Sequence, residues 1–144
     1  MDTLEDTLFQ QLASVCSESR QAFDQRVGMS QIRRQLLTLL SETGEVSHAA
    51  LQQQLVVDGA TITRLVKQFE SEAVLSRRLD PQDNRYTLVS LTVSGQQIVA
   101  GLRAAHRLFQ TRLLDGIARE EQEIVLSVLE RLRTNIRALQ DESQ

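Results

Sequence analysis

Apolar residues recur at a helical spacing near both ends of the chain and predict long amphipathic helices there. Residues 4–23 keep one apolar face, made by Leu4, Leu8, Leu12, Val15 and Phe23. In residues 119–139 the apolar positions are separated by four and three residues in turn, as in a coiled-coil heptad: Val125, Leu129, Leu132, Ile136 and Leu139. Both stripes need an apolar surface to cover them.

Two further helices are predicted inside these limits. Ser30 stands as an N-cap before an apolar face in residues 32–40, and Gly44 suits the left-handed position that ends a helix. Thr92 is the expected N-cap of a long helix that runs to about residue 117. Gly95 and Gly101 lie inside that helix and weaken it.

The middle of the chain predicts a short helix, a turn and an amphipathic helix. Ser47 and Asp58 stand where N-caps are expected, so the first helix covers residues 48–55 and the second begins at residue 59. The second helix has an apolar face with the spacing i, i+3, i+4, i+7, made by Ile62, Leu65, Val66 and Phe69. Its opposite face carries small, hydroxyl and basic residues, namely Ala60, Thr63, Arg64 and Lys67.

Residues 74–79 and 86–91 are rich in β-forming residues, and residues 80–85 between them contain Pro81 and several Asx residues. This pattern predicts a β-hairpin. The order is therefore four helices, a hairpin and two helices. We expect a mainly α fold with a small β-hairpin wing, a winged helix-turn-helix with additional helices at both ends.

The charge of the chain bears on the kind of ligand that it can bind. The formal net charge of the 144 residues is −3, which by itself argues against a nucleic-acid ligand. Residues 1–27 hold two basic and five acidic residues, whereas residues 60–85 hold five basic and four acidic ones. The net negative charge therefore lies in the N-terminal segment. The basic residues of the middle segment can still lie on one face.

The predicted arrangement suits double-stranded DNA. An α-helix fits the major groove, where arginine, lysine and threonine form hydrogen bonds to bases and phosphates. Asp58 caps the helix whose first turn approaches the duplex, and free N–H groups at such a helix end bind phosphate. Arg85, at the hairpin tip, can reach the minor groove. Arg77 and Arg78 alternate along a strand, so at most one of them faces DNA.

These features together resemble the MarR family (multiple antibiotic resistance regulators). Residues 58–66, Asp-Gly-Ala-Thr-Ile-Thr-Arg-Leu-Val, resemble the opening of that family's recognition helix. Residues 80–85, Asp-Pro-Gln-Asp-Asn-Arg, with Leu91, Thr92 and Gly95 after them, resemble its wing and the entry to its fifth helix. The flanking helices match in order and length, so the resemblance extends over nearly the whole chain.

The resemblance implies a homodimer that binds a pseudo-palindromic operator, usually as a repressor released by a small ligand or by oxidation. It places a recognition-helix set in the major groove, made of Ala60, Thr61, Thr63, Arg64 and Lys67. It places Arg85 in the minor groove, while Asp83 orients the wing through a salt bridge. The expected divisions are dimerisation helices at 1–28 and 117–144, a DNA-binding domain at 29–95 and a connecting helix at 92–116.

Two positions depart from the family pattern. Val56 occupies the turn before the recognition helix, where a small residue is common. Because a β-branched residue resists positive φ, we expect this turn to be shaped differently. Gln52 stands where the family often has alanine after the leucine of its third helix.

Cys16 has two interpretations. Some members of the family sense hydroperoxides through one cysteine of the first helix, and a sensing thiol needs solvent access and a lowered pKa. Cys16 lies beside Leu12 at the edge of the apolar stripe, Arg20 is the one cation within four residues, and the single tyrosine, Tyr86, lies in the wing. We expect an inert, partly buried thiol, with redox sensing as the alternative.

Other functions find little support in the sequence. It has no glycine-rich phosphate loop, no nucleophile elbow and no zinc-ligand spacing, so we expect neither an enzyme nor a cofactor nor a metal. The acidic N-terminus and the absence of an apolar run long enough for a membrane favour the cytoplasm. A winged-helix module that binds a protein partner is the remaining alternative to a DNA-binding regulator.

Overall fold

A computed structural model describes all 144 residues. The elements are, in chain order, α1 (Leu4–Val27), α2 (Gln31–Thr43), β1 (Val46–Ser47), α3 (His48–Leu55), α4 (Gly59–Ser71), β2 (Leu75–Leu79), β3 (Thr87–Leu91), α5 (Val93–Leu113) and α6 (Arg119–Glu142). They form two compact units, residues 1–107 and residues 108–144, which we describe separately.

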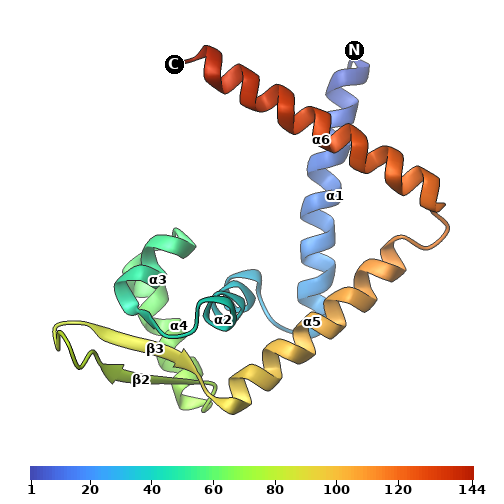
Figure 1. The fold of residues 1–144 in the computed structure, drawn as a ribbon. Coiled ribbons are helices and arrows are strands. Elements are labelled where there is room, and N and C mark those ends of the chain that lie inside the picture. Colours follow the sequence, from blue (N-terminus) through green and yellow to red (C-terminus); the bar gives the residue numbers. More distant parts are fainter. The chain divides into compact units, whose positions relative to one another are not determined.

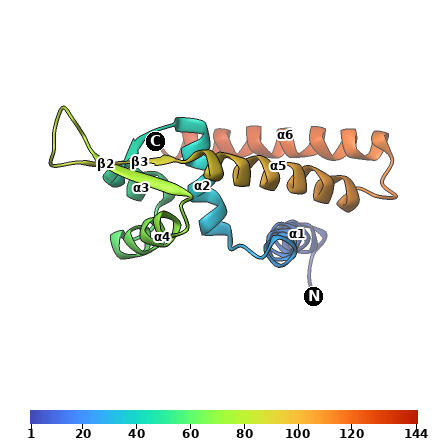
Figure 2. The same cartoon turned by 90° about the horizontal axis from the view of Figure 1, so that it is seen from below.

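The first unit contains a winged helix-turn-helix. Its antiparallel sheet has the strand order β1-β3-β2, in which Leu75 pairs with Leu91 and Val46 pairs with Val89. The β2–β3 hairpin extends beyond the helices, and α4 packs along β2 (Figures 1 and 2). One apolar core joins the sheet to four helices. Its buried members are Leu36, Leu37, Leu40, Leu51, Ile62, Leu65, Val66, Phe69, Val74, Leu75, Val89 and Val99.

Short-range hydrogen bonds set where the helices begin. The Ser47 side chain accepts from the N–H of Ala50 at 3.1 Å, and the Thr92 side chain accepts from the N–H of Gly95 at 3.0 Å. Ser30 also occupies an N-cap position, but its side chain makes no capping hydrogen bond. The structure therefore confirms the predicted start of α2. The prediction that the Ser30 side chain caps this helix is wrong.

The predicted fold class is confirmed, with differences in detail. The two-residue strand β1 was not expected, because two residues carry no alternation that a sequence pattern can reveal. The strands of the hairpin each begin one residue later than predicted, at Leu75 and Thr87. Helix α5 ends at Leu113 rather than near residue 117, and a turn with Gly116 at φ 77° follows it.

Gly95 has a packing role that the sequence did not reveal. It is buried in the first turn of α5, and a Cβ atom at this position would lie 2.3 Å from the carbonyl oxygen of Val74. No side chain fits at that separation, so the backbone of α5 approaches the start of β2 only because residue 95 is glycine. Gly101, in the same helix, faces open space.

The second unit holds the end of α5 and the helix α6. The Glu121 carboxylate accepts from the N–H of Ala118 at 3.1 Å, which satisfies one free donor at the start of α6. No residue of α6 is buried. The heptad-like positions Val125, Ile136 and Leu139 are more than half exposed, so this stripe remains uncovered in a single chain. No helix of the protein combines the length and the apolar character required to cross a bilayer.

The two glycines of α5 provide a matched test of this packing. We expect Gly95→Ala to lower the free energy of unfolding by about 3 kcal/mol, because the new methyl group must displace backbone. Gly101→Ala should raise it by about 0.5–1 kcal/mol, because alanine is the better helix former. Urea unfolding followed by circular dichroism measures both. Equal effects of the two substitutions would show that α5 does not approach β2 this closely.

Candidate nucleic-acid interface

The outer face of α4 carries the residues that the sequence assigned to the major groove. Ala60, Arg64 and Lys67 are exposed, whereas Thr61 and Thr63 are partly buried at the sides of the helix. Neither Arg64 nor Lys67 forms an ion pair or hydrogen bond within the chain. The structure therefore leaves both cations available to a ligand on this face.

Asp58 begins α4. Its carboxylate accepts from the N–H of Thr61 at 2.7 Å. This hydrogen bond, with a smaller contribution from the nearby charge of Arg64, holds the pKa of Asp58 below its usual value. One free N–H of the helix is thus already satisfied by an ionised carboxylate, and a phosphate at this end would meet the remaining donors beside a negative charge.

The turn between α3 and α4 differs from our expectation. Val56 adopts the left-handed conformation, with φ 53° and ψ 47°, although it is β-branched. The turn thus has positive φ, and the prediction of a different shape is wrong. The conformation is strained for valine, and the side chain is 88% exposed, so no packing compensates the strain.

Gln52, the second departure from the family pattern, lies against Gly59 of α4. A Cβ atom on Gly59 would lie 3.0 Å from the side-chain nitrogen of Gln52. The absence of a side chain at residue 59 therefore makes room for the larger residue on α3.

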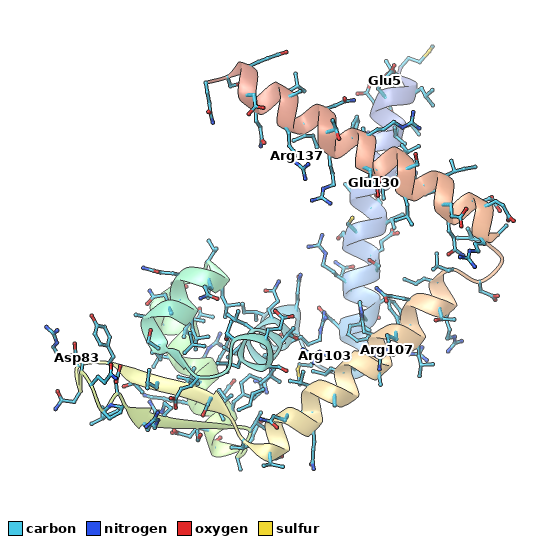
Figure 3. The ribbon with its side chains drawn as sticks, viewed as in Figure 1. Glu5, Asp83, Arg103, Arg107, Glu130 and Arg137 are labelled. Atoms are coloured by element: carbon cyan, nitrogen blue, oxygen red, sulfur yellow. The ribbon has the colours of Figure 1, made fainter.

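The tip of the hairpin holds one tight ion pair. Asp83 lies at the end of the wing (Figure 3), and its carboxylate accepts from Arg85 Nη2 at 2.8 Å and from Arg85 Nε at 2.9 Å. The hydrogen bonds from Arg85 keep the pKa of Asp83 below its usual value. The Arg85 side chain is 82% exposed, so its guanidinium faces solvent while it remains bound to Asp83.

The next two cations of the wing are both engaged by acids. Arg77 forms two hydrogen bonds of 2.8 Å to Glu70 of α4, and Arg78 forms bonds of 2.7 and 2.6 Å to Glu45, just before β1. The two side chains leave β2 on opposite faces, as alternation requires. Bidentate pairing of this kind has strong directional preference. Neither arginine was expected to pair with these acids.

His48 lies near Arg77 at the start of α3. Partial burial is the main cause that lowers the pKa of His48, and repulsion from Arg77 lowers it further. The imidazole is therefore neutral near pH 7 and adds no charge to this surface.

The prediction of a partly buried Cys16 is wrong for the single chain. Cys16 is exposed, because the apolar stripe of α1 beside it is itself uncovered: Leu4, Leu8, Phe9 and Val15 are all between 45% and 82% exposed. Arg20 donates to the backbone carbonyl of Cys16 at 3.0 Å and does not contact the thiol. The thiol has solvent access, and redox sensing at this residue stays an untested alternative.

A cavity of about 360 Å³ between α1, α2 and α5 was not predicted. Arg34 is its central cation: one nitrogen pairs with Asp24, the guanidinium lies 4.7 Å from the centre of the Phe23 ring, and the buried Nε has no hydrogen-bond partner. Arg103 and Arg107 project from α5 on this side (Figure 3). The lining residues are Phe23, Arg34, Thr38, Leu102, Arg103, His106 and Arg107.

The chain is similar to known transcriptional regulators. The model of the MarR family matches residues 30–87. The uncharacterized HTH-type transcriptional regulator YdgJ of Bacillus subtilis (strain 168) is 37% identical over 139 residues, which cover 87% of this chain and 85% of that protein.

Solved structures support the same fold. A mutant of S. aureus MepR has a TM-score of 0.80 at 18% identity and covers 94% of this chain and 99% of its own. Another MepR mutant, bound to an oligodeoxyribonucleotide, has a TM-score of 0.67 at 18% identity, again with 94% and 99% coverage. The winged helix-turn-helix predicted from the sequence is thereby confirmed.

The strain at Val56 can be measured. We expect Val56→Gly to raise the free energy of unfolding by about 1 kcal/mol, because glycine adopts positive φ without a steric penalty. Ala73→Gly is the matched control, since Ala73 has φ 60° at the other end of α4 but is not β-branched, and its gain should be smaller. Urea titrations of the three proteins give the comparison. A loss of stability in Val56→Gly would contradict the left-handed turn.

Proposed function

Because the chain belongs to the MarR family of transcriptional regulators, we propose that it binds a pseudo-palindromic operator as a homodimer and acts as a repressor. Two copies of α4 would enter successive major grooves about 34 Å apart on one side of the duplex. Arg85 of each wing would reach the adjacent minor groove. The repressor assignment rests on the family resemblance.

The observation that carries this proposal is the outer face of α4. Arg64 and Lys67 are exposed on it and form no ion pair or hydrogen bond, while the four apolar residues opposite them are buried in the core. A helix held by its apolar side presents these cations and Thr63 in a fixed orientation. Such a face supplies the donors that guanine and phosphate accept from.

Uncovered apolar surface supports the homodimer. Leu4, Leu8 and Phe9 are exposed on α1, and Ile124, Val125, Leu126, Ile136 and Leu139 are exposed on α6. Apolar stripes of this extent are uncommon on the surface of a monomer, because covering them is favourable. A second copy of the chain offers the same stripes, as a two-fold interface requires.

The cavity beside Arg34 supports regulation by a small ligand. The Arg34 guanidinium lines this cavity, and an anionic group in the cavity would be attracted to its charge. Arg103 and the Phe23 ring complete a cationic site with an aromatic wall, so we propose a small aromatic anion as effector. The effector would shift operator affinity only if it binds the DNA-bound and free forms of the protein differently.

The DNA face is tested by binding to a duplex selected from a randomised library. Arg64→Ala should weaken binding by about 1–3 kcal/mol and relax the sequence preference, as loss of a base contact does. Lys67→Ala should weaken binding to all duplexes and reduce the salt dependence, as loss of a phosphate contact does. Arg85→Ala should weaken binding chiefly where the flanks are A/T-rich. Fluorescence anisotropy across a salt series measures these effects.

Arg26→Ala is the control for this experiment, because Arg26 is an exposed cation of α1 outside the winged module. It should leave affinity and selectivity unchanged. If the unmodified protein selects no sequence at any salt concentration, the DNA-binding function is wrong, and a winged helix that binds a protein partner takes its place.

The effector site is tested with benzoate and its neutral analogue benzamide. We expect benzoate to raise the melting temperature and to release the selected duplex, whereas benzamide should do neither, because it lacks the charge that the arginines bind. Arg103→Gln should require about tenfold more benzoate, the cost of one charge-assisted hydrogen bond. Arg26→Gln should respond like the unmodified protein. Equal responses to benzoate and benzamide would contradict an anion site.

A further inference from the structure

The last turn of α4 is unusually acidic for the end of a helix. Glu70 lies in this turn and Glu72 follows it as the C-cap, although the helix dipole disfavours negative charge at a C-terminus. Both carboxylates also stand on the helix proposed to approach DNA. Their position therefore needs a reason other than helix stability or DNA affinity, and two arginines from other elements supply it.

On one side, Arg33 of α2 makes three contacts with the C-terminal end of α4. Its guanidinium carbon lies 4.3 Å from the centre of the Phe69 ring, its Nη1 donates to the side-chain oxygen of Gln68 at 2.9 Å, and its Nη2 lies 3.6 Å from the Glu72 carboxylate. Its side chain is only 25% exposed. A partly buried arginine that stacks on a ring and bonds to two side chains has one available orientation.

On the other side, Arg77 of β2 holds Glu70. Arg77 Nε and Nη2 each donate to a different oxygen of the carboxylate at 2.8 Å. Isolated surface pairs contribute little to stability, but the fork geometry of this pair fixes the direction of the Glu70 side chain. These hydrogen bonds from Arg77 also lower the pKa of Glu70, so the carboxylate is ionised at neutral pH.

The two contacts act on opposite flanks of the helix. At about 100° per residue, Gln68 and Glu72 lie on one side of the apolar face and Glu70 lies on the other, with the buried Phe69 between them. Arg64 and Lys67 point away from that apolar face. Rotation of α4 about its own axis in either direction must therefore break one of the arginine contacts.

We propose that Arg33 and Arg77 are positioning residues which fix the rotation of α4 about its axis and thereby determine operator selectivity. Apolar packing alone tolerates small rotations, because aliphatic contacts have no direction. The directional contacts of Arg33 and Arg77 remove that freedom. The inference rests on the proposed DNA-binding function of α4.

The proposal and simple electrostatics predict opposite signs for Glu70→Gln. This substitution removes a negative charge beside the DNA face and frees Arg77, so electrostatics alone predicts tighter binding to every duplex. If Glu70 positions the helix, affinity for the selected duplex falls while affinity for random duplexes stays equal or rises. We expect the ratio of the two affinities to fall by about tenfold, the loss typical of one base contact.

The experiment measures both affinities by anisotropy, with the duplex selected by the unmodified full-length protein and a random duplex of equal length. Glu42→Gln is the matched control, because Glu42 is an exposed carboxylate of α2 without a hydrogen bond or ion pair. It should leave the ratio unchanged. Arg33→Gln should lower the ratio as Glu70→Gln does. Circular dichroism and melting curves establish that each variant is folded.

Reversal of the charges of the Glu70–Arg77 pair gives the decisive test. Glu70→Arg and Arg77→Glu should each lose selectivity, and the double variant, which has the parental net charge and an inverted pair, should regain it. Selectivity that survives Glu70→Gln, or a double variant no better than either single one, would overturn the inference while leaving the proposed function intact. Failure of the unmodified protein to select a duplex would instead overturn the proposed function, and the inference with it.

Discussion

The backbone of Val74 joins four elements of the winged module. Its N–H donates to the carbonyl of Phe69 at 2.9 Å, which closes the end of α4, and its carbonyl accepts from the N–H of Thr92 at 3.0 Å, which follows β3. Thr92 in turn caps α5, and Gly95 lets that helix approach the same carbonyl. Helix α4, the wing and the start of α5 therefore share one set of hydrogen bonds, which couples their positions. A ligand beside α5 could act on α4 through this junction without touching it.

Pairing of charges explains how an acidic chain can offer a basic surface. Arg77, Arg78 and Arg85 are each bound by a carboxylate of the same module, so most of its charge cancels locally. Arg64 and Lys67 form no such pair, so their positive charge is exposed on the outer face of α4. The net charge of −3 has little bearing on that face, because screening limits distant charges to a short range in salt solution.

Features decided by neighbours in the chain could be predicted from the sequence. The caps at Ser47, Asp58 and Thr92 each depend on a residue three positions away, and the buried face of α4 follows from helical spacing. The basic face of α4 could be predicted for the same reason, whereas the salt bridge of Asp83 was implied by the family resemblance.

Features decided by distant residues could not be predicted. The strand β1 exists only through its pairing with β3, and Glu70 meets Arg77 only after the chain has folded. The cavity at Arg34 needs three helices to form. Cys16 is exposed because the apolar stripe of α1 is uncovered in the single chain. Helical spacing alone does not show whether such a stripe is covered. Val56 shows the reverse case, since its intrinsic preference is overridden by the tight turn that joins α3 to α4.

If the wing enters DNA as proposed, the ion pair at its tip makes that entry an exchange of partners for Arg85. Arg85 is already bound to Asp83 through two nitrogens, so a groove gains this side chain only by offering more than a carboxylate does. Narrow A/T-rich minor grooves have the strongest negative potential, whereas wide ones have less. In the proposed complex, Asp83 would set a threshold: Arg85 would leave Asp83 for grooves of strong negative potential and stay bound to it beside the others. Asp83 would then filter the shape of the DNA without contacting a base.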